Sequence, residues 1–405
     1  MQTLTTTTPE TNACPRLDSD PFAEEVLRNP YPFHEQLREA GPLVWLERYG
    51  IWATGHFEHV DATLRDWQTF CSGAGVGLAN FHTERPWRRP SIILEADPPL
   101  HTRTRGVLSR ILSPVAIKKL RETFAQQAEI LVERLVAGRR FDAVTDLARV
   151  FPTRVFPEAL GIRYDGSDNL LRYGDMNFNA FGPRNALFER SMANADEVSA
   201  WIMQHCERDA LSSDGFGAQI YAAADNGELS YEEAGLLVRS FLAAGLDTTI
   251  NGLGNALYCF AHHPEQWQAL RAAPTLARGA FDEVLRFESP VQTFFRTAAE
   301  DTVLAGQPVA RGQKVMLSLG AANRDARHWE APERFDITRR ATGHVGFGAG
   351  IHGCVGQMVA RLEADVVFKA LVDRVAHFEL DGEPEPYLNN TLHGWASLPV
   401  RIEPA

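Results

Sequence analysis

The chain has 405 residues, of which 44% are hydrophobic and 23% are charged, and its formal net charge is −12. This composition is typical of a globular protein, and the acidic excess argues against a nucleic-acid partner. Five widely spaced cysteines are an odd number, so they predict free thiols in a reducing compartment rather than a disulfide framework.

The N-terminal stretch 1–18 is rich in Thr, Pro and Asn and has no apolar core of the kind found in signal or anchor segments. We expect a disordered tail over residues 1–18 and a single folded domain over residues 19–405, because no linker divides the rest of the chain. These features predict a cytoplasmic protein that has no membrane partner.

The first folded third contains a hairpin pattern and then an irregular stretch. Val44–Leu46 and Ile51–Ala53 are short apolar runs on either side of a turn, which predicts two paired strands. Residues 71–90 carry several glycines, prolines and arginines and match neither helix nor strand. A long irregular segment inside a compact domain is often functional.

Asp97-Pro98-Pro99 has the residue types of a helix start, with Asp97 as the expected N-cap. His101 and Arg105 follow four residues apart, so they share one face of that helix. Two donors on one face suit an anionic group.

Residues 114–225 have mostly helical periodicity, and Phe178 and Phe181 precede a helix-breaking Gly-Pro pair. On residue type alone, core packing explains the two rings as well as ligand binding does. Ser230 and Glu233 then form a capping-box pattern that starts the next helix.

That next helix is apolar on nearly all sides, which predicts a path through the core over residues 236–249. Arg239 and Asp247 interrupt it, and buried charge is costly unless it has a partner or a task. Gly245 weakens the helix and leaves room for a small molecule beside it. The hydroxyl of Thr248 follows directly after the acid.

A glycine-studded loop ends in a cysteine and is followed by residues of helix-forming composition. Cys354 is therefore expected at a helix N-terminus, where backbone N–H groups favour a thiolate. A shielded thiolate is the axial ligand of one kind of haem, and Phe347 can exclude water from it. Alternating glycines also occur in phosphate-binding loops, but no Lys-Ser/Thr pair follows them here.

The spacing Phe347-Gly348-x-Gly350-x-His352-x-Cys354-x-Gly356 resembles the haem-ligand loop of the cytochrome P450 monooxygenases. The resemblance extends over nearly the whole chain and implies a mainly α protein with a smaller β-rich region. In this fold the haem lies between the oxygen-binding helix and the cysteine loop. It implies haem b as cofactor, with its iron bound by Cys354.

The same resemblance assigns further roles. It implies that Asp247 and Thr248 are the acid and alcohol that deliver protons during dioxygen cleavage. It places the haem against Ala244 and the cysteine loop, and its propionates against the donors His101, Arg105, Arg296 and His352. It implies a structural ion network of Glu283, Arg286 and Arg334, which includes the arginine of Ala331-Pro332-Glu333-Arg334-Phe335.

Several stretches, including 86–97, 178–183, 237–240 and 288–296, resemble one bacterial branch of the family that oxidises para-substituted benzoates. The implied reactions are O-demethylation of 4-methoxybenzoate and hydroxylation of 4-alkylbenzoates. The implied carboxylate-binding residues are Arg88, Ser91, Arg239 and Ser240. The implied ring-binding residues are Leu94, Phe178, Phe181, Ala244, Val291 and Phe294. Ala243 departs from the branch, in which a serine occupies this place.

The physics of the residues agrees with a small aromatic acid, since arginines and hydroxyls hold a carboxylate and apolar side chains hold a ring. Alternatives are a neutral methoxy- or alkyl-phenol as substrate, a peroxygenase, and a non-catalytic haem sensor.

A chain of this length has no room for a flavin or nicotinamide domain beside the fold. The resemblance therefore implies O2 as co-substrate, with electrons from a [2Fe–2S] ferredoxin and its NAD(P)H-dependent reductase. We expect the ferredoxin on a cationic surface that includes Arg110, Lys118, Lys119 or Arg361.

Overall fold

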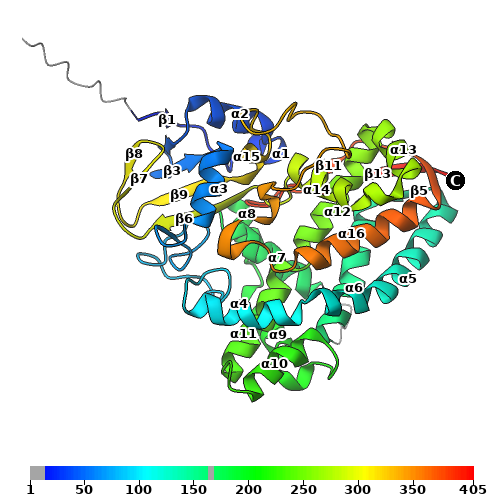
Figure 1. Ribbon diagram of the computed structural model, residues 1–405, viewed down its shortest axis with the longest axis horizontal. Helices are drawn as coiled ribbons and strands as arrows, with labels where there is room; N and C mark the ends of the chain where they lie inside the picture. The colour runs from blue at the N-terminus through cyan, green and yellow to red at the C-terminus, as the bar shows by residue number, and fades with distance from the viewer. Residues whose placement is uncertain (1–13, 163–167) are drawn as a thin grey trace, which may run out of the picture.

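Helices make up most of the computed structural model, which describes residues 14–162 and 168–405, and the strands β3, β6 and β9 of its largest sheet lie to one side (Figure 1). The α-helices are α1 Glu24–Arg28, α2 Tyr31–Ala40, α3 Phe57–Arg65, α4 Leu100–Ile111, α5 Pro114–Gly138, α6 Val150–Leu160, α7 Asn169–Asn179, α8 Ala186–Ser191, α9 Ala195–His205, α10 Phe216–Asp225, α11 Tyr231–Ala244, α12 Asp247–His262, α13 Pro264–Ala272, α14 Ala277–Phe287, α15 Leu319–Asn323 and α16 Gln357–Val372. Short π- and 3-10 helices are η1 Ala143–Ala148, η2 Arg208–Ala210, η3 Pro274–Leu276, η4 Val345–Phe347 and η5 Gly350–His352.

The largest sheet has six strands in the order β1-β2-β3-β9-β6-β4. Smaller sheets have the orders β10-β13-β5, β11-β12 and β7-β8. The strands are β1 Arg16–Leu17, β2 Val44–Leu46, β3 Ile51–Thr54, β4 Phe70–Cys71, β5 Arg140–Asp142, β6 Thr293–Ala298, β7 Thr302–Leu304, β8 Gln307–Val309, β9 Lys314–Ser318, β10 Val375–Leu380, β11 Glu385–Pro386, β12 Trp395–Ser397 and β13 Pro399–Pro404.

The expected hairpin is present, because β2 and β3 pair antiparallel with Trp45 opposite Trp52. The sequence predicted a disordered tail over residues 1–18, and the structure describes only the last part of it. Its residues 1–13 lie outside the described residues, whereas Arg16 and Leu17 form β1, which pairs in parallel with β2. The ordered chain therefore begins before residue 19.

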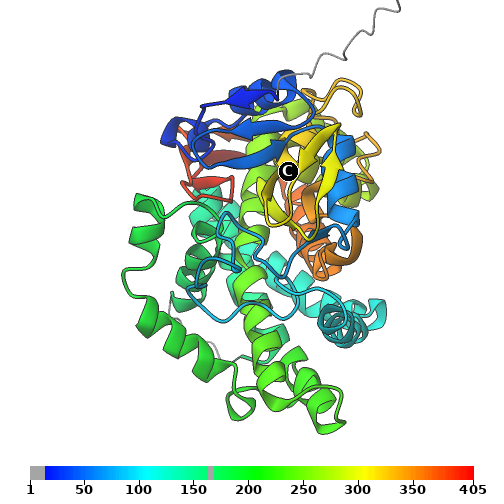
Figure 2. The same ribbon diagram turned by 90° about the vertical axis from the view of Figure 1, so that its left-hand side faces the viewer.

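The expected capping box is present at the start of α11, where the Ser230 side chain accepts from the backbone N–H of Glu233 and the Glu233 side chain accepts in return. The expected helix over 236–249 is broken, since α11 ends at Ala244 and α12 begins at Asp247. The two helices follow one another through the middle of the molecule (Figure 2). A Cβ on Gly245 would lie 2.1 Å from the Phe156 ring, so only glycine fits at this position, and Gly245 lines a cavity beside the two helices, which agrees with the predicted room for a small molecule.

Asp97 does not cap α4, contrary to the sequence prediction. Its carboxylate accepts from the backbone N–H groups of Ser72 at 2.9 Å and Gly73 at 2.8 Å. The residue that precedes α4 is Pro99, which offers no side-chain cap. Asp97 therefore anchors the glycine-rich segment instead of the helix.

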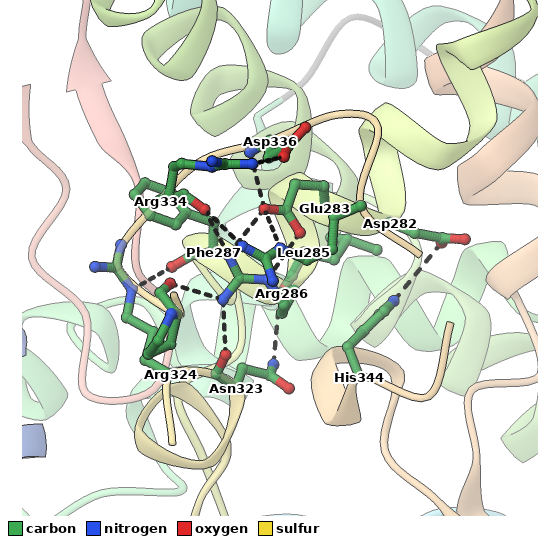
Figure 3. Close-up of polar contacts among 12 residues, drawn as sticks. Asp282, Glu283, Leu285, Arg286, Phe287, Asn323, Arg324, Arg334, Asp336 and His344 are labelled. Carbon is green, nitrogen blue, oxygen red and sulfur yellow. Dashed lines mark hydrogen bonds and ion pairs between the residues drawn. The ribbon is translucent and has the colours of Figure 1, made fainter. Parts of the chain in front are cut away.

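A buried ion pair on α14 joins that helix to the chain before the cysteine loop (Figure 3). The Glu283 carboxylate accepts from Arg286 Nε at 2.7 Å and Nη2 at 2.8 Å, and both side chains are fully buried. The guanidinium also donates to the carbonyls of Asn323 and Pro332 at 2.9 Å and of Arg334 at 3.2 Å. Each buried donor therefore has an acceptor, which is the condition under which a buried charge is tolerated.

The predicted role of the Arg334 side chain is wrong. Its guanidinium is 69% exposed and pairs with Asp336, and only its carbonyl contacts Arg286. Arg339 takes the predicted place, because its Nε lies 3.2 Å from Glu283 Oε1 in a side chain that is 13% exposed. Which arginine joins Arg286 as the second partner of Glu283 depends on the path of the chain after residues 331–335.

We expect Glu283→Ala to lower the free energy of unfolding by about 3–5 kcal/mol, because it leaves a buried guanidinium without its counter-ion. Arg334→Ala should change it by about 0–1 kcal/mol, since that side chain is exposed, and Arg339→Ala should cost more. Urea unfolding of the haem-loaded variants measures these values. Equal losses from Arg334→Ala and Arg339→Ala would contradict this account of the network.

Candidate active site

A cavity of about 260 Å³ lies between the middle of α11–α12 and the cysteine loop. Its wall includes residues from α4, α7 and β6, which are far apart in sequence. All ten side chains predicted for substrate binding line this cavity: Arg88, Ser91, Leu94, Phe178, Phe181, Arg239, Ser240, Ala244, Val291 and Phe294. The same wall contains Cys354 and most residues predicted to hold the haem, namely Arg105, Ala244, Arg296, Phe347, Gly348, His352 and Gly356, together with Thr248.

The cysteine loop is a tight structure that precedes α16. Gly348 and Gly350 have φ values of 68° and 65°, a left-handed conformation that glycine adopts without strain. The backbone N–H of Cys354 donates to the Phe347 carbonyl at 2.8 Å. The loop thus closes on itself and directs the cysteine into the cavity wall.

Asp282 fixes both ends of this loop to α14. It lies 3.6 Å from His344 Nε2, at the start of the loop, and 2.8 Å from Arg361 Nε, on α16 (Figure 3 shows the His344 contact). The Arg361 guanidinium also lies 4.6 Å from the centroid of the Phe347 ring. Arg361 is therefore engaged inside the fold, and it is not the free surface cation that the sequence predicted.

The thiol of Cys354 has hydrogen-bond donors around it, as predicted, but these donors lower its pKa by less than burial raises it. Burial raises its pKa above the ordinary value, while the backbone N–H groups of Gly356 and Gln357 and the charges of Arg105 and Arg361 act in the opposite direction. Without an added cation the protonated thiol is favoured. A metal ion bound by Cys354 would supply the missing positive charge, because a coordinating thiol is deprotonated.

Three of the four predicted propionate donors, Arg105, Arg296 and His352, line the cavity, whereas His101 is not part of the wall and lies beside His352. The rings of His101 and His352 are 4.3 Å apart, and the Nε2 atom of each is buried without a hydrogen-bond partner in the described parts of the chain. Burial, Arg296, His101 and Arg105 together lower the pKa of His352 to about 3. Burial also lowers the pKa of Arg105, and it lowers that of Arg296 to about 10.

This donor set fits haem b. Unpaired imidazole nitrogens and guanidinium groups at one end suit two carboxylates, and a cysteine faces the cavity from the loop. Apolar side chains such as Leu108 and Phe347 suit the faces of a macrocycle. Cys354 would bind the iron, and His101, Arg105, Arg296 and His352 would hold the propionates.

The two predicted catalytic residues point in different directions. Thr248 lines the cavity, and its hydroxyl donates to the Ala244 carbonyl at 2.9 Å. Asp247 is buried, and its Oδ2 has no hydrogen-bond partner among the described residues. Burial and then the nearby charge of Asp175 raise the pKa of Asp247 to about 8.

The two predicted carboxylate-binding arginines are not equivalent. Arg88 donates to Glu95 at 2.8 Å and to Asn177 at 2.7 Å, so its charge already has a partner. Arg239 is 5% exposed, and in the described parts of the chain its donors reach only the carbonyls of Arg89 at 2.8 Å and Pro90 at 3.3 Å. Within the described ranges Arg239 has no carboxylate at ion-pair distance.

The two serines lie together, with Ser91 Oγ 3.1 Å from Ser240 Oγ. In the same cavity wall, the Phe178 and Phe181 rings pack edge to face with centroids 5.9 Å apart, and the centroid of Phe181 lies 6.0 Å from that of Phe294. The cavity therefore combines polar groups, including Arg239 without a carboxylate partner in the described chain, with an aromatic wall. The roles of these residues stay predictions.

Sequence reasoning missed two charged residues of this region. Glu363 lines the cavity with both carboxylate oxygens unpartnered in the described chain, and burial raises its pKa well above the ordinary value. Lys314 is buried and donates to the carbonyls of Ala74 at 3.2 Å and Gly75 at 2.6 Å, which ties the glycine-rich segment to β9. The sequence signal that could have found them is that each is a charged residue within an otherwise apolar helix or strand.

The fold and the cysteine loop together define a haem-thiolate protein. A family model described as Cytochrome P450 matches residues 189–403, and the chain belongs to this family. It is a cytochrome P450 monooxygenase with haem b as its cofactor, which confirms the family prediction. As a monooxygenase it uses O2 and receives electrons from redox partner proteins. In the described ranges no helix is long and apolar enough to cross a membrane.

The chain is 51% identical to cytochrome P450 CYP199A2 of Rhodopseudomonas palustris over 392 residues, which is 96% of this chain and 95% of that protein. It is 32% identical to linalool 8-monooxygenase of Pseudomonas putida, with 95% and 98% of the two chains covered. The structure of cytochrome P450 CREJ in complex with (4-ethylphenyl) dihydrogen phosphate superimposes with a TM-score of 0.86 at 29% identity, covering 95% of this chain and 99% of that chain.

We expect Asp247→Asn to stabilise the protein at alkaline pH. Because the folded-state pKa of Asp247 is raised from 3.8 to about 8, the wild type loses stability as pH rises through this range, and the variant does not. The stability difference should be absent near pH 4, grow with pH and level off above about pH 8. Urea unfolding across this range measures it, with Thr248→Ala as a control that lacks the pH-dependent difference.

Proposed function

We propose that this monooxygenase oxidises small para-substituted aromatic acids, such as O-demethylation of 4-methoxybenzoate or hydroxylation of 4-alkylbenzoates. The observation that carries the proposal is Arg239, a buried guanidinium that faces the cavity without a counter-ion in the described chain. An uncompensated buried cation is costly, and a substrate carboxylate is the group that relieves the cost.

Arg88 supports the carboxylate site in a secondary role. Because Glu95 already neutralises its charge, Arg88 contributes hydrogen-bond donors more than net charge. The pair of hydroxyls on Ser91 and Ser240 can donate to the same carboxylate. Arg239 is therefore the residue expected to determine the preference for acids.

Anchoring the acid end sets the position of attack. A ring held between Phe178, Phe181 and Phe294 points its para substituent away from Arg239, along the cavity toward the cysteine side. Fixing both ends of a small substrate in this way restricts it to one reactive orientation. The apolar wall also excludes water from the reacting group.

The bound haem supplies the activation of dioxygen, and the chain supplies binding, orientation and protons. Thr248 presents a hydroxyl at the cavity wall, and Asp247 holds a proton one residue away on the protein side. Such an acid–alcohol pair is needed for a monooxygenase, whereas a peroxygenase or a haem sensor has no use for it.

Two similar proteins support the substrate class. The 51% identity to CYP199A2 over nearly the whole chain agrees with the branch that the sequence resembles. The CREJ structure holds (4-ethylphenyl) dihydrogen phosphate, an anionic para-substituted phenyl compound, in the same fold. A neutral methoxy- or alkyl-phenol is the second candidate, because Ala243 lacks a hydroxyl and the Ser91–Ser240 pair can bind a phenol group.

We expect 4-methoxybenzoate to shift the Soret band of the ferric protein at much lower concentration than neutral 4-methoxytoluene. Arg239→Leu should weaken binding of the acid by roughly ten- to a hundredfold, because a charge-assisted hydrogen bond contributes about 1.5–3 kcal/mol. Binding of the neutral ether should be unchanged. Arg172→Leu, at an exposed position of α7, is the matched control. Tighter binding of the ether than of the acid by the wild type would refute the acid as substrate.

We further propose a [2Fe–2S] ferredoxin, reduced by an NAD(P)H-dependent reductase, as the electron donor. Of the four cations expected on its docking surface, Arg361 is engaged with Asp282 and Arg110 pairs with Glu228. Lys118 and Lys119 remain exposed on α5, which packs against α16. These two lysines are the revised docking cations.

We expect the double variant Lys118→Glu/Lys119→Glu to slow reduction by ferredoxin about tenfold at low ionic strength, because exposed charges steer encounter. The difference should fade at high salt. Stopped-flow reduction measures the rate, and Arg311→Glu, at an exposed turn before β9, serves as control. A rate unchanged at low salt would place the docking surface elsewhere.

A further inference from the structure

Two stretches that are far apart in sequence supply the aromatic wall of the cavity. Phe178 and Phe181 lie at the end of α7 and in the turn that follows it, whereas Val291 precedes β6 and Phe294 lies in it. The four side chains belong to one apolar cluster or pack against it. The separation of the two stretches therefore determines the width of the slot that a ring would enter.

A third segment, near the C-terminus, joins these two stretches. It consists of Asn389, Asn390 and Thr391, which are all buried and which we call the clasp. The described wall of the cavity includes none of the three. The clasp can therefore act on a bound ring only through the residues that it contacts.

The side chain of Asn390 holds both ends of the turn after α7. Its Nδ2 donates to the carbonyls of Asn179 at 3.0 Å and Pro183 at 3.3 Å. The side-chain amides of Asn390 and Asn185 also bond to each other in both directions, at 2.8 and 3.1 Å. A Cβ on Gly182 would lie 2.5 Å from Asn390 Cβ, so the turn packs directly against this residue.

Thr391 links α7 to the stretch before β6. Its hydroxyl donates to the Phe178 carbonyl at 2.8 Å, and its carbonyl accepts from the Gln292 N–H at 2.9 Å. The next residue, Leu392, pairs with Val291 in a β-bridge. One short segment thus fixes the backbone of both stretches that carry the ring-binding side chains.

Asn389 fixes the clasp itself. Its Oδ1 accepts from the backbone N–H groups of the residues two and three positions farther on, at 2.9 and 3.1 Å, as asparagine does in turns. Its Nδ2 donates to Asp175 Oδ1 at 3.1 Å. Because Asp175, Phe178 and Asn179 are three and four residues apart, the clasp contacts a single face of α7.

The backbone of Phe181 is also held by the glycine-rich segment. Its carbonyl accepts from the Leu78 N–H at 2.7 Å, and a Cβ on Gly77 would lie 2.6 Å from Phe181 Cα. The Phe181 ring can therefore move only together with this segment or after the turn is released at Asn390.

We propose that Asn390 and Thr391 are positioning residues that determine how strictly the slot selects para-substituted rings. A site keeps its shape when hydrogen bonds behind it hold the residues that line it. A para substituent lies along the long axis of the ring, whereas a meta substituent projects sideways and needs a wider slot. The inference rests on the ring-binding roles in the proposed function, and it does not depend on the carboxylate.

The test compares para and meta isomers in the haem-loaded protein. Soret titrations give Kd for 4- and 3-methoxybenzoate and for the neutral pair 4- and 3-methoxytoluene. We expect the wild type to prefer the para isomer of each pair about tenfold, which is the usual penalty for a small misfit in an apolar pocket. Asn390→Ala should lower both meta-to-para Kd ratios severalfold. Asn226→Ala, at an exposed position after α10, is the control and should leave them unchanged.

A pair of variants at Thr391 separates the hydrogen bond from the general stability of the fold. Thr391→Val removes the hydroxyl that holds the Phe178 carbonyl and should lower both ratios, whereas Thr391→Ser keeps the hydroxyl and should retain them. A merely structural role would reduce haem content or weaken both isomers equally, and it would not move the ratios.

Gly182→Ala tests the same contact from the other side if Asn390→Ala fails to bind haem. The added methyl group would meet Asn390 Cβ and displace the turn, so both ratios should fall.

Ratios that are the same in the wild type, Thr391→Val and Gly182→Ala overturn the inference, as does a wild type that binds both isomers of each pair equally well. The proposed acid substrate survives that result if the wild type still binds the acid more tightly than the ether. Ratios that fall in both pairs, in a protein that prefers the ether, support the clasp and reject the acid.

Discussion

The buried pair Glu283–Arg286 is the interaction on which the haem-binding side of the structure depends. A charged pair in the core is tolerated only when every donor and acceptor has a partner, and here those partners are backbone carbonyls of Asn323, Pro332 and Arg334. Satisfying one guanidinium thereby holds three separate points of the chain against α14. The requirement is geometric, because a carbonyl that moved away would leave a buried N–H unpaired.

From this pair the constraint passes to the cysteine loop. The side-chain oxygen of Asn323 accepts from the backbone N–H of Val345 at 2.9 Å, at the start of the loop. Asp282, next to Glu283, contacts His344 and Arg361 on either side of Cys354. The position of the sulfur is thus determined by α14 through two parallel sets of contacts. The loop can be rich in glycine, and still be held in one conformation, because its rigidity comes from outside it.

How much of this could be predicted from the sequence depends on how far apart the partners lie. The cysteine loop, the capping box of Ser230 and the pair His101–Arg105 are contiguous or share one helix turn, so spacing alone locates them. The second arginine that contacts Glu283, besides Arg286, is Arg339 rather than Arg334, and the Asp97 side chain binds Ser72 and Gly73 rather than its own helix. These choices depend on how distant segments pack.

The environment of Asp247 shows why packing of this kind matters for chemistry. Asp247 is the first residue of α12, where helix N–H groups favour a carboxylate, while burial and Asp175 favour the protonated acid. These influences oppose one another and bring its pKa to about 8, near the pH at which an acid both gives and regains a proton readily. An arginine paired with Asp247 would hold it ionised, and full isolation in the core would hold it protonated. Backbone N–H groups at the start of α12 and the charge of Arg149 oppose burial and Asp175, and this balance keeps the acid between these limits, which is the state that repeated proton transfer requires.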